Sequence, residues 1–158
     1  MNQYGHGKGT TQGGFSEYSV VKAKYCYVLQ SNISFDDAVL LEPMGVAFNG
    51  LNRINVKGND VLIIGAGAIG LFATAIAKAL GASKVLVADI NNDRLALAKE
   101  LGADVVINTL DTDLLQEVKR ITNGAGKQSM LAILRSFLKT KKLTEDVQII
   151  QKITEITP

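Results

Sequence analysis

The sequence predicts an α/β protein built on a doubly wound parallel sheet, and two observations carry that prediction. Short apolar runs alternate with stretches of helical periodicity along residues 61–121. A glycine-rich turn joins the first apolar run to the first helical stretch. Strands and helices that alternate with short links form right-handed parallel crossovers, which place helices on the faces of one sheet.

The residues before this alternation follow a different pattern. Residues 1–14 are polar and rich in glycine, which predicts a loop. Residues 15–29 are rich in tyrosine and valine, which favour extended backbone, so two short strands are predicted there.

A helix is predicted next, beginning at Ser34. Ser34 is a candidate N-cap, and Asp36 and Asp37 would interact favourably with the positive end of the helix dipole. Helical spacing of apolar residues continues to Arg53, and Pro43 is expected to kink or restart the helix.

Three strand–helix units follow. The first strand is a continuous apolar run, as expected of a strand buried on both faces. Glycines end the first two helices. The predicted strands are residues 61–64, 84–88 and 105–107, and the predicted helices are residues 71–80, 93–101 and 114–121.

The alternation stops after Gly126. Residues 127–158 read as basic and helix-forming, with six basic residues against three acidic ones and no clear fourth strand. We therefore expect this tail to be foreign to the fold, for example the product of a frameshift. A sheet of three strands would leave an edge open, so a homo-oligomer is expected.

Composition excludes several classes of protein. The chain is 47% hydrophobic and 20% charged, with a net charge of +2, so neither a nucleic-acid partner nor a membrane partner is expected. The N-terminus has no apolar signal segment, and no run approaches the ~18–20 apolar residues of a membrane helix. The single cysteine fits a reducing compartment, so the expected location is cytoplasmic.

The glycine-rich turn has the pattern Gly-x-Gly-x-x-Gly at residues 65–70. It follows the first predicted strand and opens a helix, and Asp89 lies 19 residues after Gly70 at the end of the second strand. Gly65 would allow the tight turn, Gly67 would let the backbone approach a pyrophosphate, and Gly70 would let the helix pack on the strand. This is the fingerprint of a Rossmann dinucleotide site, whose alternative is a turn that only connects strand to helix.

Two charged residues follow the second strand. Asp89 is expected to accept hydrogen bonds from the adenosine ribose, which selects NAD and repels the 2′-phosphate of NADP. Its alternative is an N-cap, although Asn91 and Asn92 lie nearer the helix start. Arg94 could reach the same ribose or phosphate, or it could be a solvated charge on the helix, and the sequence leaves both open.

These segments occur together in the order seen in a known family. The chain resembles the zinc-dependent medium-chain alcohol/polyol dehydrogenases, closest to the sorbitol, butanediol and threonine dehydrogenase branch. The resemblance covers about residues 12–126. It rests on residues 13–21, 29–33, 41–47 and 65–70 together with Asp89 and Arg94.

The resemblance implies three regions. Residues 1–55 would be the end of a GroES-like catalytic domain with its linking helix, residues 56–126 the front half of an NAD-binding Rossmann domain, and residues 127–158 a tail unlike the family. By position in the family, Glu42 of the Leu-Glu-Pro motif would lie at the catalytic zinc. Zinc needs about three protein ligands, and neither His6 nor Cys26 matches a ligand position of the family.

The resemblance implies hydride transfer between NAD and a secondary alcohol, polyol or hydroxy-amino acid, with zinc in the complete enzyme. The isolated chain is expected to be inactive, because the family takes its zinc ligands from a segment upstream of residue 13. The alternatives are a non-catalytic nucleotide-binding module and an inactive product of a truncated gene. The candidate cofactor-binding residues are Gly65, Gly67, Ala68, Ile69, Gly70, Asp89 and Arg94, and the candidate metal ligand is Glu42.

Overall fold

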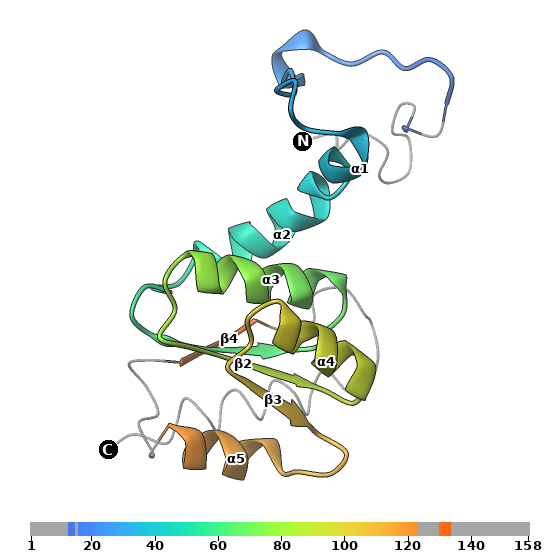
Figure 1. The fold of residues 1–158 in the computed structure, drawn as a ribbon. Helices are drawn as coiled ribbons and strands as arrows, with labels where there is room; N and C mark the ends of the chain where they lie inside the picture. Colours follow the sequence, from blue (N-terminus) through green and yellow to red (C-terminus); the bar gives the residue numbers. More distant parts are fainter. Residues whose placement is uncertain (1–12, 15, 123–129, 134–158) are drawn as a thin grey trace. The chain divides into compact units, whose positions relative to one another are not determined.

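The computed structural model describes residues 13–14, 16–122 and 130–133 (Figure 1). The chain divides into two compact units, with the boundary between Ala38 and Val39. Helix α2 (Leu41–Leu51) packs against α3 (Ala68–Ala79), so α2 belongs to the second unit. The predicted division after residue 55 concerns the domains of the larger family proteins and stays a prediction.

The first unit contains a single 3-10 turn, Ala23–Tyr25, and the short helix α1 (Phe35–Ala38) among its described residues. The prediction of two strands in residues 15–29 is wrong for the residues that the structure describes. Tyr18, Tyr27 and Val28 are exposed, and no described strand pairs with their backbone. A preference for β structure reflects packing against neighbouring strands, and that preference does not form a strand where no partner lies alongside.

The predicted helix around Pro43 forms as two pieces. Ser34 caps α1 as predicted: its Oγ accepts the N–H of Asp37 at 3.1 Å and donates to the Asp37 carboxylate at 2.6 Å. The restart at α2 is confirmed, because Pro43 lies in the first turn of that helix, where the N–H that it lacks would have no helical partner. No helix in the described part of the chain is long and apolar enough to cross a membrane.

The second unit contains the predicted doubly wound sheet. Its strands are β1 (Asp60–Ile64), β2 (Lys84–Asp89), β3 (Val105–Asn108) and β4 (Met130–Ile133). All pairs are parallel and the order is β3-β2-β1-β4. The helices between the first three strands and after the third are α3, α4 (Asn92–Glu100) and α5 (Leu114–Ile121).

The fourth strand corrects the prediction that the fold ends at Gly126. Asp60 pairs with Met130 and Ile63 with Ile133, so β1 has a partner on both sides. Met, Leu and Ala are good helix formers, and a run of four apolar residues cannot be assigned to strand or helix from its pattern. Pairing with β1 decides the conformation instead. Residues 134–158 lie outside the described residues.

The strands place alternate side chains on opposite faces of the sheet. Figure 1 shows α3 and α4 on one face and α5 on the other. Val61, Ile63, Val85 and Val87 pack in one core with α2, α3 and α4, and Leu62, Leu86 and Ile107 pack in a second core with α5. Burial on both faces explains why these strands read as continuous apolar runs.

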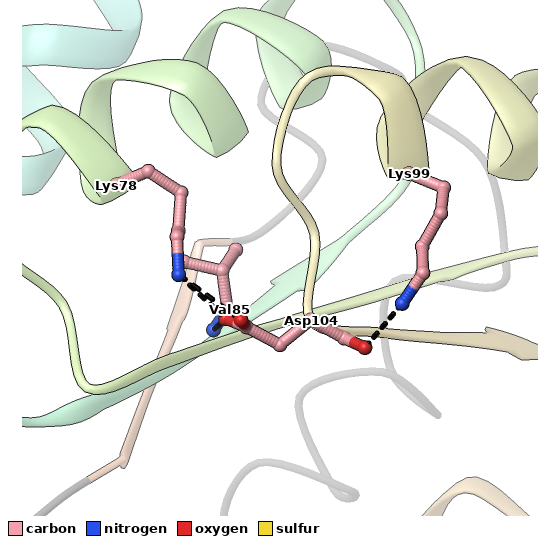
Figure 2. Close-up of polar contacts among 4 residues, drawn as sticks. All are labelled: Lys78, Val85, Lys99 and Asp104. Atoms are coloured by element: carbon pink, nitrogen blue, oxygen red, sulfur yellow. Dashed lines mark hydrogen bonds and ion pairs between the residues drawn. The ribbon is translucent and has the colours of Figure 1, made fainter.

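At the amino ends of the strands, Asp104 joins several elements (Figure 2). Its carboxylate accepts the N–H of Val85 at 2.6 Å, next to the start of β2. Lys99 in the last turn of α4 donates to its backbone carbonyl oxygen. The loop before β3 is therefore held to both β2 and α4. These contacts lie at the end of the sheet where the strands begin, whereas the glycine-rich turn lies at the end where β1 and β2 stop.

Candidate dinucleotide-binding site

The candidate site lies where β1 and β2 end and α3 begins. β1 ends at Ile64, and Gly67 is the N-cap of α3. Ile64 pairs with Ala88 in the parallel register. Because the carboxyl ends of parallel strands meet at one edge, Asp89 lies directly beside the turn.

Two glycines allow the turn to take its shape. Gly65 has a φ of 97°, a backbone angle that residues with a Cβ rarely adopt. Its N–H donates to the carbonyl oxygen of Ala88 at 2.7 Å. At Gly70 an added Cβ would lie 1.8 Å from the carbonyl oxygen of Gly65. The same Cβ would lie 3.5 Å from the Ile63 side chain of β1, so the prediction that Gly70 lets the helix pack on the strand is confirmed.

The backbone at Gly67, in the middle of the turn, borders open space. A Cβ added at Gly67 would meet nothing within 4 Å. Among the described residues, none accepts a hydrogen bond from the N–H of Gly67, Ala68 or Ile69. The start of α3 also carries the positive end of the helix dipole. These groups are suited to hold an anion such as a pyrophosphate.

Asp89 is the acidic side chain beside this anion site. Its Oδ2 accepts the N–H of Ala66 at 2.6 Å, and its Oδ1 accepts the N–H groups of Ile90 and Asn91 at 2.8 and 2.9 Å. The carboxylate is half-buried. The N-cap of α4 is Asn91, whose side chain accepts the N–H of Arg94, so the alternative interpretation of Asp89 as that cap is wrong.

Arg94 and Ile69 lie on the first turns of α4 and α3. The Arg94 side chain is exposed, on the helix that follows Asp89. Ile69 is half-buried and packs against the core that the sheet forms with α2, α3 and α4. The exposed position of Arg94 is compatible with a cofactor contact and with a solvated charge on the helix, so its assignment stays a prediction. The assignment of Ile69 to the cofactor site also stays a prediction.

The described residues do not supply the donor set that zinc requires. Glu42 is exposed in the first turn of α2. Nowhere in the described ranges do three His, Cys, Asp or Glu side chains come together. Cys26 is exposed in the first unit, and His6 lies outside the described residues. The role of Glu42 therefore stays a prediction.

Sequence reasoning missed the contact between Asp89 and the turn. It gave Asp89 a role toward ribose, whereas in the structure the carboxylate holds the backbone N–H of Ala66, a fully buried residue. A signal was available, because β2 runs one residue past the partner of Ile64, so the parallel register places the last residue of β2 beside the turn that follows β1.

Together, a parallel β3-β2-β1-β4 sheet, a glycine turn at its carboxyl edge and an acidic residue ending β2 define a Rossmann-type domain. Residues 68–134 match the family described as zinc-binding dehydrogenase. That match extends eight residues beyond Gly126 and therefore includes β4.

Three known proteins show the likeness. L-threonine 3-dehydrogenase of Coxiella burnetii is 40% identical over 109 residues, which are 69% of this chain and 32% of the relative. Galactitol-1-phosphate dehydrogenase from Escherichia coli superposes with a TM-score of 0.76 at 32% identity, over 90% of this chain and 39% of that one. A short chain alcohol dehydrogenase from E. coli CFT073, complexed with cofactor NADH, gives 0.72 at 34% identity, over 87% and 40%.

The chain belongs to the zinc-dependent medium-chain dehydrogenase family. It spans about a third of the length of the curated relatives that it matches. The family resemblance predicted from the sequence is therefore confirmed, and the matching relatives include L-threonine 3-dehydrogenases and a sorbitol dehydrogenase.

Proposed function

We propose that this chain binds the adenosine diphosphate part of NAD for an oxidoreductase that acts on a secondary alcohol, polyol or hydroxy-amino acid. NAD, when bound, accepts or returns hydride at its nicotinamide ring. The chain's own residues would bind and orient the other half of the cofactor. The observation that carries the proposal is the group of N–H donors at Gly67, Ala68 and Ile69, which have no acceptor in the described part of the chain and lie beside the Asp89 carboxylate.

The chemistry of these groups matches the ligand. A pyrophosphate is a doubly charged acceptor, and three backbone donors at a helix start can bind it without a lysine or arginine. The Asp89 carboxylate accepts hydrogen bonds and carries negative charge, which favours ribose hydroxyls over a 2′-phosphate. The NADH complex of the E. coli relative supports this choice of cofactor.

The other parts of the proposal rest on the family. In the whole protein, residues 1–55 would end the GroES-like catalytic domain, and zinc would be held with Glu42 among its ligands. The substrate class follows the relatives, which include L-threonine 3-dehydrogenase and galactitol-1-phosphate dehydrogenase. A cytoplasmic location fits the single cysteine and the near-neutral charge.

The test separates binding from folding through Gly67→Ala. Gly67 has a φ of −74°, which alanine adopts, and the added methyl group has open space around it. The variant should therefore fold normally but crowd the pyrophosphate. Titration calorimetry with ADP should show binding to the wild type and at least about tenfold weaker binding to Gly67→Ala.

Gly50→Ala is the matched control. Gly50 lies in α2, and its added Cβ also meets nothing within 4 Å. This variant should bind ADP as the wild type does. If the folded wild type binds no ADP, or if Gly67→Ala binds it equally well, the proposed site is wrong.

A further inference from the structure

The hydrogen bonds of the glycine-rich turn are divided between two tasks. The N–H groups of Gly65 and Ala66 donate to the end of β2, to the carbonyl oxygen of Ala88 and to the Asp89 carboxylate. The next donors, beginning at Gly67, have no acceptor among the described residues. The first two bonds thus fix the peptide units from which the free donors project.

Ala66 makes the second of these bonds necessary. Ala66 is 0% exposed, so water cannot replace an acceptor for its N–H. A buried N–H without an acceptor destabilises the conformation that buries it. Without the Asp89 carboxylate, the turn would therefore favour conformations in which the peptide before Gly67 rotates toward solvent.

The carboxylate also has little capacity left for ribose. A carboxylate offers about four lone-pair directions, and Oδ1 already accepts two N–H groups while Oδ2 accepts one. One direction on Oδ2 remains. A single ribose hydroxyl can bind there without displacing a backbone donor, and a second hydroxyl would compete with the turn.

We propose that Asp89 is a positioning residue for the pyrophosphate as well as an acceptor for the ribose. Its carboxylate holds the glycine-rich turn in the conformation that presents the donors from Gly67 to Ile69. Affinity for the phosphates then depends on Asp89 even when the ligand has no ribose hydroxyl. This inference rests on the proposed function, since it concerns the same nucleotide site.

The experiment compares ADP with 2′,3′-dideoxy-ADP, which keeps both phosphates and lacks both ribose hydroxyls. Asp89→Ala should weaken binding of the dideoxy ligand about tenfold or more, because the turn loses its acceptor. Asp93→Ala is the matched control, since Asp93 is an exposed carboxylate in the first turn of α4. It removes the same charge and should leave the affinity of the dideoxy ligand within about twofold of the wild type.

Hydrogen exchange at the Ala66 amide gives a second readout without ligand. Exchange should be slow in the wild type and in Asp93→Ala and at least about tenfold faster in Asp89→Ala. If Asp89→Ala does not fold, Asp89→Asn replaces it, because either orientation of the amide points an NH₂ group at backbone donors. Its weaker effects should have the same direction.

The outcomes separate the two claims. If Asp89→Ala weakens ADP binding but leaves the dideoxy ligand and the Ala66 amide unchanged, Asp89 acts on ribose alone and the positioning role is wrong. If the folded wild type binds neither ligand, the proposed function fails. The Ala66 amide then decides the positioning of the turn by itself, and exchange that is unaffected by Asp89→Ala overturns it.

Discussion

The Lys78 ammonium nitrogen lies 3.0 Å from both carboxylate oxygens of Asp104, and this pair ties the last turn of α3 to the loop before β3 (Figure 2). Desolvation acts to raise the pKa of Asp104. The hydrogen bond from the Val85 N–H and the interactions with Lys78 and Lys99 outweigh it, so the pKa lies below the ordinary 3.8. The carboxylate form is therefore stabilised by folding.

We predict that Asp104→Ala lowers the free energy of unfolding by about 1–3 kcal/mol at pH 7, because the N–H of the fully buried Val85 loses its acceptor. A depressed folded pKa stabilises the protein above the unfolded pKa and ceases to do so as pH falls through the folded value. The difference between wild type and variant should therefore shrink below about pH 4.

Urea unfolding at pH 7 and pH 3 measures this difference. Asp111→Ala, in an exposed loop, serves as the control and should match the wild type at both values. Since the Lys78–Asp104 pair is about a third exposed, most of the effect at pH 7 should come from the backbone acceptor rather than from the ion pair. A difference that is independent of pH would contradict the assignment.

A second prediction concerns Gly70→Ala. The added Cβ would lie 1.8 Å from the backbone oxygen of Gly65, which cannot move without disturbing the turn. Unfolding free energy should fall by about 3 kcal/mol, the upper part of the range for overpacking. Gly50→Ala makes the same chemical change in open space and should be neutral or stabilising by up to about 1 kcal/mol. Equal stability of the two variants would contradict the packing shown here.

A third prediction concerns the choice between cofactors. NAD should bind more tightly than NADP, because the 2′-phosphate would displace a hydrogen bond to Asp89 and face its charge. The loss is about 1.5–3 kcal/mol, or about ten- to over a hundredfold in affinity. Calorimetry with both cofactors on wild type and on Asp89→Ser measures it, and the preference should narrow in the variant. Equal affinities in the wild type would remove Asp89 as the selector.

The sequence was sufficient for the first three strands, whose side chains pack in the cores on both faces of the sheet. The bounds of β1, β2 and β3 were predicted to within one residue at each end, because glycines and polar turn residues mark where each apolar run begins and ends. It failed at residues 15–29 and at β4, where pairing with another segment, or its absence, decides the conformation. In the site, glycine spacing identified the turn, whereas the bond between Asp89 and Ala66 depends on strand register.

The fourth strand yields a further prediction. A chain ending at residue 126 lacks the partner that β4 provides for β1, whereas a chain ending at residue 134 keeps it. Hydrogen exchange should show the β1 amides that face β4 protected in the longer chain and exposed in the shorter one. The β1 amides that face β2 serve as the internal control and should be protected in both. Equal protection of all β1 amides would contradict the pairing of β1 with β4.

The order of the sheet also has a consequence during synthesis. The ribosome delivers β1 and β2 in close succession, so Asp60 can pair with Lys84 soon after both emerge, whereas Met130 arrives much later. At about 5–20 residues per second, the interval between the end of β2 and the end of β4 is roughly 2–9 s. Throughout that interval the nascent chain exposes the unpaired backbone N–H and C=O groups along one edge of β1, and a chaperone or a neighbouring nascent chain has access to them.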